Sequence, residues 1–230
     1  MEKYFIDALK RNNVVLNDNQ LAQFAIYADT LISYNEKVNL TAIVDREEIY
    51  VKHFLDSILP SFVYKIDGNI CDVGAGAGFP SIPLKIIYPD IEVTIVEPIG
   101  KRVEFLKELC KKLEIDVNIV NARAEDFAKD YRESFDNVTA RAVANLQILS
   151  ELCIPLVKVG GQFIVLKGNK GEEELNLARN AITKLGGKVT DINNQHLIDD
   201  IQRVNILITK VSKTQLTYPR NYSKIKSKPL

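Results

Sequence analysis

Hydrophobic side chains follow one period in the first part of this chain and another arrangement after about residue 69. In the first part they recur every three or four residues, which predicts helices over residues 2–11, 18–36 and about 45–59. Asn17 or Asp18 would cap the second helix, and Asp45 would cap the third. We therefore expect a helical N-terminal segment that packs on the rest of the molecule.

After residue 69, short runs rich in Val and Ile alternate with helical stretches near 81–88, 101–113, 145–157 and 171–184. The expected strands are Ile70–Val73, Glu92–Val96, Val117–Asn121, Asn137–Arg141 and Gln162–Leu166. Strands that alternate with helices require crossovers, so they favour a parallel sheet in an α/β fold. No helical pattern separates Lys188–Asp191 from Val204–Val211, so we expect these to close the sheet as an antiparallel pair.

A glycine-rich turn follows the first of these strands and reads Asp72-Val73-Gly74-Ala75-Gly76-Ala77-Gly78-Phe79-Pro80. Glycine lacks a Cβ, so this backbone takes positive φ and lets a ligand approach, and the next helix adds free N–H groups that favour an anion. The spacing is not the G-x-G-x-x-G of dinucleotide domains, because the sixth residue from Gly74 is Phe79 and from Gly76 is Ser81. This form, like an antiparallel pair ending the sheet, is typical of S-adenosylmethionine (SAM) enzymes of the Rossmann-like methyltransferase class.

Acidic residues flank this turn in the sequence. Glu97 ends the second strand, where an acid can accept hydrogen bonds from the two hydroxyls of a ribose. That role fits NAD and SAM alike, and the alternative is a loop acid that caps the helix at Gly100. Asp72 is interpreted as a cofactor-shell acid or a brace of the turn rather than as a proton-transfer group.

Composition limits the setting. A chain of 230 residues with 46% hydrophobic content suits one globular domain with an appendage. Cys71, Cys110 and Cys153 are far apart and form no C-x-x-C pair, so we expect small buried side chains and no disulfide. No apolar run approaches the roughly 18 residues that span a bilayer, and Met1–Phe5 does not begin a secretory leader, which predicts a cytoplasmic protein.

Charge is unevenly distributed although the formal net charge is zero. No acid follows Asp200, and residues 201–230 carry seven cations, so the first 200 residues carry the balancing negative charge. A cationic tail on an acidic body predicts a polyanionic partner, and Tyr218 and Tyr222 between the cations would allow stacking on bases. The alternative is a frayed, solvated terminus.

An ordered set of motifs resembles the bacterial RsmG (GidB) family over nearly the entire chain. The motifs are Asn35–Thr41, His53–Ser57, Asp72–Pro80, Gly100–Arg102 before Phe105–Leu106, Arg123–Glu125, Ala140–Ala144, Leu166–Gly168, Tyr218–Arg220 and Lys228–Leu230. The resemblance implies a class I SAM-dependent methyltransferase that methylates N7 of a guanine in a loop of 16S ribosomal RNA near the decoding region.

Site residues follow from the resemblance together with the turn. The expected cofactor-binding residues are Asp72, Gly74, Gly76, Gly78, Phe79, Glu97, Ala124, Glu125 and Arg141. The candidate catalytic residues are Arg141, Arg123, Asn39 and His53, and the candidate RNA-binding residues are Arg203, Arg220, Lys224, Lys226 and Lys228. Structural alternatives are a satisfied helix histidine for His53, a turn brace for Asn39, and ion pairs for Arg123 and Arg141.

The chemistry implied by the resemblance also fits what the chain lacks. Guanine N7 has a lone pair in the ring plane, so it can attack a sulfonium methyl without a general base, and the enzyme need only align the reactants. No Asn-Pro-Pro-Tyr or Asp-Pro-Pro-Tyr motif for an exocyclic amine occurs, and no cysteine suits a carbon-5 pyrimidine enzyme. The histidines, His53 and His196, lack ligand spacing, so no metal is expected.

These inferences predict an N-terminal helical segment (1–60), a SAM-binding domain (61–212) and a basic tail (213–230). The expected partner is 16S ribosomal RNA or the small ribosomal subunit, with no membrane contact, and the protein is expected to be a monomer. Three alternatives stay open: a methyltransferase with a small-molecule or protein substrate, a non-catalytic RNA-binding assembly factor, and an NAD-dependent oxidoreductase.

Overall fold

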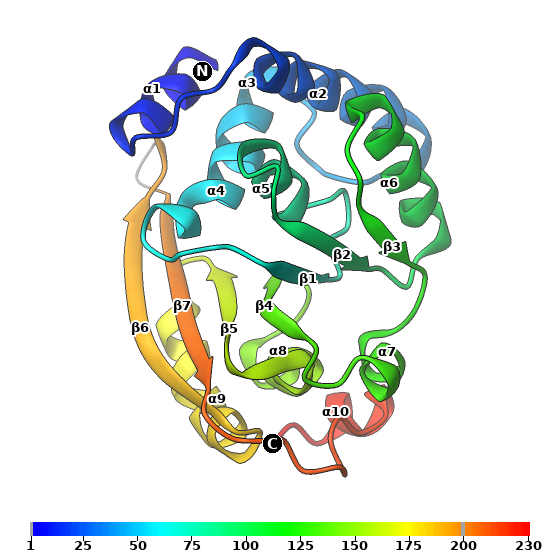
Figure 1. Cartoon of the computed structure of the whole chain (residues 1–230), viewed down its shortest axis with the longest axis vertical. Helices are drawn as coiled ribbons and strands as arrows, with labels where there is room; N and C mark the ends of the chain where they lie inside the picture. Colours follow the sequence, from blue (N-terminus) through cyan, green and yellow to red (C-terminus); the bar gives the residue numbers. More distant parts are fainter. Residues whose placement is uncertain (1, 199–200) are drawn as a thin grey trace.

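A computed structural model describes residues 2–198 and 201–230 and shows one sheet with helices on both faces (Figure 1). The helical N-terminal part contains α1 (Glu2–Arg11), α2 (Asp18–Val38), α3 (Arg46–Glu48), η1 (Ile49–Leu55), α4 (Asp56–Ile58) and η2 (Leu59–Phe62). The strands are β1 (Asn69–Val73), β2 (Glu92–Val96), β3 (Asn118–Val120), β4 (Phe135–Arg141), β5 (Val157–Lys167), β6 (Gly187–His196) and β7 (Gln202–Lys210). The remaining helices are α5 (Ser81–Ile87), α6 (Gly100–Leu113), α7 (Ala124–Asp130), α8 (Leu146–Cys153), η3 (Ile154–Leu156), α9 (Gly171–Lys184) and α10 (Tyr222–Ser227).

The seven-stranded sheet has the order β3-β2-β1-β4-β5-β7-β6. Strands β1 to β5 pair in parallel, whereas β7 lies antiparallel between β5 and β6. The predicted α/β architecture with a closing antiparallel pair is therefore confirmed. The chain order reverses beside β1, and the carboxyl ends of strands at such a switch point form the ligand crevice of an open sheet.

Two helices were not predicted, and several bounds differ. The stretch expected to be helical to residue 157 leaves the α-helix at Cys153, passes through η3 and enters β5 at Val157. Helices α7 and α10 are short, with seven and six residues, so their apolar periodicity is too brief to read from the sequence.

Local capping sets the ends of the N-terminal helices. The Asn17 side chain accepts a hydrogen bond from the Gln20 backbone N–H at 2.9 Å, and the Gln20 side chain accepts one from the Asn17 N–H at 3.0 Å, which completes a capping box. The Asp45 carboxylate accepts from the Glu48 N–H at 2.9 Å. Both predicted caps are confirmed, with Asn17 rather than Asp18 at the start of α2.

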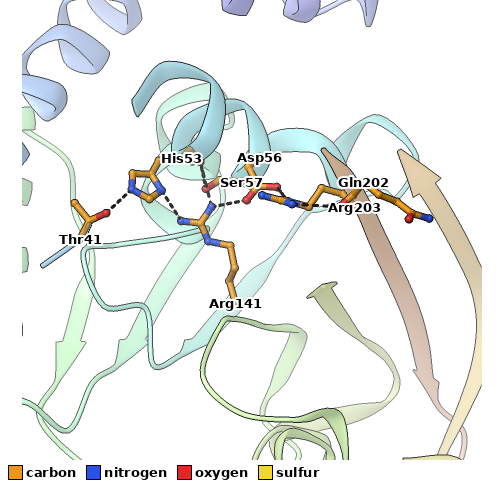
Figure 2. Close-up of polar contacts among 7 residues, drawn as sticks. All are labelled: Thr41, His53, Asp56, Ser57, Arg141, Gln202 and Arg203. Carbon is orange, nitrogen blue, oxygen red and sulfur yellow. Dashed lines mark hydrogen bonds and ion pairs between the residues drawn. The ribbon is translucent and has the colours of Figure 1, made fainter. Parts of the chain in front are cut away.

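The third predicted helix contains a wider segment. Residues 46–62 form one helical run, but Ile49–Leu55 is π-helical. In a π-helix each hydrogen bond joins groups five residues apart in the sequence instead of four. Such segments occur frequently at functional sites. Here the π-helical segment contains His53, and Asp56 follows at its end. Both side chains point toward Arg141 (Figure 2).

The two larger of three hydrophobic clusters lie on opposite faces of the sheet. Ile70 belongs to the core under α1, α2, α5 and α6, whereas Cys71 belongs to the core under α7, α8 and α9 (Figure 1). All three cysteines are free and buried, as predicted, and burial raises the pKa of each thiol. Within the described residues, no helix is both long and apolar enough to cross a membrane.

The C-terminal segment is docked rather than frayed. The Arg132 guanidinium donates hydrogen bonds to three backbone carbonyl groups of this segment, those of Thr214, Gln215 and Tyr218. Arg220 forms two side-chain hydrogen bonds, of 2.6 and 2.8 Å, with Glu151 of α8, which is fully buried. These contacts hold α10 beside α7 and α8 (Figure 1).

Candidate functional site

The glycine turn after β1 has the backbone that its sequence predicted. Gly74, Gly76 and Gly78 have φ angles of +72°, +61° and +95°, values that side chains rarely adopt. A Cβ at Gly78 would lie 2.6 Å from Ile82 and 2.8 Å from the Tyr27 hydroxyl, so glycine is also needed there for packing. A Cβ at Gly76 would meet nothing within 4 Å, so this part of the turn is open to a ligand.

Acidic side chains and α2 brace this turn. The fully buried Asp72 accepts a hydrogen bond from the Ser81 N–H at 3.1 Å, and burial raises the pKa of its carboxyl to about 7. Glu97 accepts from the Gly76 N–H and from the Ile99 N–H, each at 3.0 Å. Tyr27 of α2 donates to the Ala77 carbonyl at 2.6 Å. Asp72 therefore braces the turn, as one of its two interpretations expected. Glu97 supports both the turn and the start of α6, and its role toward a ribose stays a prediction.

A pocket of about 370 Å³, here called the Glu97 pocket, lies beside the turn. Its charged and polar lining comes from Glu97, Arg102, Arg123, Glu125 and Tyr222, and its apolar lining includes Val73, Val96, Ile99, Ala124 and Leu152. Ala124 and Glu125 open α7 directly after Arg123, which is the residue before the helix. The predicted Gly74, Glu97, Ala124 and Glu125 are thus brought together around one hollow.

A second pocket of about 620 Å³, here called the Arg141 pocket, lies at the carboxyl ends of β4 and β5. Its polar lining comes from Lys52, His53, Asp56, Arg141, Asn145, Lys167, Glu174 and Arg203. Of the expected site residues, this pocket therefore collects His53, Arg141 and Arg203. Lys52, Asp56, Asn145, Lys167 and Glu174 were not predicted as site residues.

Asp56 joins two arginines at the wall of the Arg141 pocket (Figure 2). Arg141 donates to one carboxylate oxygen at 3.0 Å, and Arg203 donates to the other at 2.6 Å. The Asp56 side chain is 7% exposed, and those of Arg141 and Arg203 are 13% and 22% exposed. One carboxylate thus fixes two guanidinium groups that come from different strands, β4 and β7.

His53 is a neutral hydrogen-bond partner of Arg141. The distance from Arg141 Nη2 to His53 Nδ1 is 3.4 Å, and the distance from His53 Nε2 to Thr41 Oγ1 is 2.7 Å (Figure 2). Because a guanidinium can only donate, Nδ1 accepts and Nε2 carries the proton to Thr41. Burial first, and then the positive charge of Arg141, lower the pKa of His53 to about 3. His53 is therefore uncharged at neutral pH and orients Arg141.

Phe79 lies under this group as a buried platform. Its ring is 4.5 Å from the His53 ring and 5.4 Å from the Tyr27 ring, both stacked, and 4.6 Å from the Arg141 guanidinium carbon. A cation over an aromatic face is attracted by the ring quadrupole. Phe79 thus supports Arg141 and is absent from the lining of either pocket, so its predicted cofactor contact stays a prediction.

The loop after β4 separates the two pockets. Ala142 and Val143 line both of them, and Ala142 has a φ of +56°. A Cβ at Gly74 would lie 2.8 Å from Val143, so this loop packs tightly on the glycine turn. A ligand in one pocket therefore lies one loop away from a ligand in the other.

The remaining predicted residues lie outside this pair of pockets or at its border. Asn39 is exposed and ends α2 with a φ of +27°, and it lines neither pocket. Lys224, Lys226 and Lys228 are exposed on or after α10, whereas Arg220 is occupied by the buried Glu151. Among the described residues, no group of three or more histidine, cysteine or acidic side chains could hold a metal ion.

One signal in the sequence could have revealed Asp56, because residues three apart lie on one side of a helix and His53 was already singled out. The sequence marked Tyr222 as a tail aromatic that could stack on bases, but its place beside the Glu97 pocket depends on how the tail docks.

Comparisons with known proteins agree with this arrangement. The family model described as "GidB: rRNA small subunit methyltransferase G" matches residues 20–206. A Staphylococcus aureus (strain bovine RF122 / ET3-1) protein named "Ribosomal RNA small subunit methyltransferase G" is 51% identical over 223 residues, which cover 95% of this chain and 93% of that protein. The relative of the same name from strain JH9 is 50% identical over the same shares.

Solved structures share the fold at low identity. TYW2 of Pyrococcus horikoshii in complex with MeSAdo aligns with a TM-score of 0.56 and 18% identity over 70% of this chain and 63% of that chain. The Thermus thermophilus 16S rRNA N2 G1207 methyltransferase in complex with AdoMet and guanosine aligns with a TM-score of 0.50 and 17% identity over 70% and 39%. Their architecture is the class I methyltransferase sheet seen here.

Proposed function

The chain belongs to the family of rRNA small subunit methyltransferase G, and on this premise we propose that it transfers a methyl group from SAM to N7 of a guanine in 16S ribosomal RNA. The observation that carries the proposal is the pair of adjoining pockets, one beside a glycine turn and one lined by fixed arginines. The loop at Ala142 and Val143 is their shared wall, so a donor and an acceptor would meet across it.

The Glu97 pocket suits a nucleoside such as SAM. Gly76 leaves space where any other residue would carry a Cβ, and the Glu97 carboxylate stands at the end of β2, where a ribose hydroxyl pair is recognised in open α/β sheets. The apolar lining from Ile99, Ala124 and Leu152 matches a purine. We propose that Gly74, Gly76, Glu97, Ala124 and Glu125 hold the cofactor, which supplies an electrophilic methyl group when bound.

In the Arg141 pocket, this chain's residues would orient the base. Arg141 and Arg203 present guanidinium donors, which match guanine O6 and phosphate oxygens. Because His53 is neutral and hydrogen-bonded through both ring nitrogens, it would serve Arg141 rather than the base. Guanine N7 already has its lone pair, so alignment and exclusion of water suffice for transfer.

The RNA would be presented as an unpaired loop, because the deep, narrow major groove of A-form RNA hides N7. We propose that the exposed Lys224, Lys226 and Lys228 contact phosphates near such a loop. A ribosomal substrate also supports action in the cytoplasm, on 16S ribosomal RNA or the small subunit. We propose that the protein acts as a monomer.

The test is methyl transfer from tritiated SAM to small-subunit particles purified from cells that lack this gene. We expect label at one guanine of 16S ribosomal RNA. Treatment with borohydride and then aniline should cleave the RNA strand at this position, which identifies the product as N7-methylguanine. Two controls should take up no label. Large-subunit particles lack 16S ribosomal RNA, and small subunits from cells with the gene already carry the methyl group. Label in metabolites or proteins instead, or bound SAM without transfer, would contradict the proposal.

A further inference from the structure

The C-terminal segment contributes an aromatic side chain to the Glu97 pocket. Tyr222, the first residue of α10, lines this pocket together with Ile99 and Arg102 from the start of α6 and with Leu152 of α8. Among the residues of this lining, it is the one aromatic side chain. A tail that the charge pattern linked to RNA therefore also reaches the proposed cofactor side.

Several contacts fix Tyr222 in this place. The Arg123 guanidinium carbon lies 5.5 Å from the centre of the Tyr222 ring, and Arg123 directly precedes Ala124 and Glu125 of the same pocket. Ile225, one turn later in α10, is fully buried in the core beside α8. The Asn221 side chain accepts a hydrogen bond from the Lys224 N–H at 3.0 Å and caps the helix.

The anchors of the tail lie on both sides of this residue. Before it, Arg132 binds three carbonyl groups and Arg220 binds the buried Glu151. After it, Gln147 of α8 donates to the Leu230 carbonyl at 3.1 Å. The position of Tyr222 is thus set by the docked tail and not by a loose end of the chain.

The chemistry of this wall suits a purine. Stacking of a base on an aromatic side chain tolerates any base, and an arginine plane beside the ring adds a cation–π contribution. Glu97 also lines this pocket, at the end of β2, where a ribose is expected.

We propose that Tyr222 is a cofactor-positioning residue that covers the purine side of the Glu97 pocket, with Arg123 holding its ring. This inference rests on the proposed function, because it takes SAM as the nucleoside. It also couples the two ligands, because the basic tail contributes to the cofactor site. If RNA bound to the tail changes the affinity of the pocket for SAM, then SAM changes the affinity of the tail for RNA by the same factor.

The absence of tryptophan from the chain gives a direct test. Tyr222→Trp would place a single indole at the pocket, and S-adenosylhomocysteine, the demethylated product, serves as the probe. We expect saturable quenching of its fluorescence. Leu216→Trp is the matched control, because Leu216 lies in the same segment, is 90% exposed and lines neither pocket, so its fluorescence should stay unchanged.

Calorimetry then separates a positioning role from a merely structural one. Tyr222→Ala should weaken binding of S-adenosylhomocysteine and of adenosine about tenfold, as expected from loss of one stacked base, and leave methionine binding unchanged. Tyr222→Phe keeps the aromatic face and should bind within about twofold of the unaltered protein, because stacking depends on the ring. Circular dichroism and melting temperature confirm that the variants fold.

The outcomes distinguish the two levels of inference. Equal affinity of Tyr222→Ala and the unaltered protein for adenosine, or no quenching in Tyr222→Trp, would overturn the role of Tyr222 alone. Failure of the unaltered protein to bind S-adenosylhomocysteine would overturn the proposed function instead. If the tail is coupled to the pocket, the product should also slow tryptic cleavage at Lys224 and Lys226 in the unaltered protein and not in Tyr222→Ala.

Discussion

The Arg141 pocket and the Glu97 pocket share one loop but are built by different means. The first depends on side chains far apart in sequence, since Asp56 from the N-terminal half binds Arg141 and Arg203, 85 and 147 residues later. The second starts from a short turn whose positive φ angles are local, although Glu97 braces that turn and the docked tail adds Tyr222 to the pocket. Charge pairing thus shapes the Arg141 pocket, and backbone geometry shapes the turn beside the Glu97 pocket, so substitutions of Asp56 and of the turn glycines should have separate effects.

The largest effect is expected from Asp56→Asn, which leaves two partly buried guanidinium groups without their shared carboxylate. Removing one partner of a buried ion pair costs about 3–5 kcal/mol of unfolding free energy. Urea denaturation measures this loss. Glu108→Gln is the control, because Glu108 pairs with Lys112 on the exposed face of α6, where such a pair contributes at most about 1 kcal/mol. Equal losses in both variants would mean that Asp56 does not organise the pocket.

Arg141→Lys keeps the positive charge but removes the fork that reaches Asp56 and His53 together. We expect kcat/KM for methyl transfer to small subunits to fall about 100-fold, as when one oriented donor is lost from an active site. Calorimetric affinity for S-adenosylhomocysteine should stay the same. Arg179→Lys on the exposed side of α9 is the control. A parallel loss of cofactor affinity would place Arg141 on the donor side, as the resemblance also implied.

Gly74→Ala tests the boundary between the pockets. The positive φ costs about 1–2 kcal/mol for alanine, and the new Cβ would also press on Val143. Gly76→Ala has a similar φ but open space, so it should destabilise less. Adding Val143→Ala should remove the difference, which a double-mutant cycle of unfolding free energies measures. No coupling between positions 74 and 143 would refute the close contact of turn and loop.

The neutral state of His53 predicts an acid-dependent stability of the Arg141 pocket. The pKa of His53 is about 3 in the folded protein and 6.5 without the influence of the fold. Between these two pH values, the unfolded chain binds a proton at His53 that the folded protein does not bind. Stability contributed by the neutral form is present above pH 6.5 and is lost as pH falls below it.

Compared with His53→Gln, the unaltered protein should therefore lose about 1 kcal/mol more unfolding free energy between pH 7 and 5.5. Urea denaturation at the two pH values measures the difference. Asp72, whose raised pKa acts in the opposite direction, is present in both proteins and cancels. An identical pH dependence would show that His53 is charged when folded.

The smallest effect is expected when Lys224, Lys226 and Lys228 are replaced together by Gln. RNA affinity should weaken about threefold at moderate salt, and the dependence of log K on log salt should flatten by up to about 2, because fewer counterions are released. Affinity for S-adenosylhomocysteine should stay the same. The matched control replaces Lys107, Lys111 and Lys112 of α6, which are also exposed. An unchanged salt slope would remove the tail lysines from the RNA contact.

Local features of this fold were predictable from the sequence, whereas contacts between distant segments were not. Periodicity and the turn glycines indicated β1, β2, β4 and both helix caps, because each depends on neighbours within a few residues. The π-helical run at Ile49–Leu55 was missed, because its apolar spacing resembles that of an ordinary helix.

Long-range pairing explains what the sequence did not show about the site. Arg220 looked like one more tail cation, but its partner Glu151 lies 69 residues earlier and is buried. Tyr222 reaches the Glu97 pocket only because the tail is anchored by Arg132 and Arg220. Composition records such charges without recording which of them are paired.

The insertion of β7 between β5 and β6 has a consequence for biosynthesis. A chain is made from its N-terminus, so β6 emerges before β7, the only strand with which it pairs in the described sheet. Asp56 can bind Arg203 only after β7 has been made as well. The glycine turn can fold early, but the Arg141 pocket, which is the proposed RNA site, cannot. We therefore expect a nascent polypeptide of this protein to stay inert toward the ribosome that is translating it, and to mature only after its release.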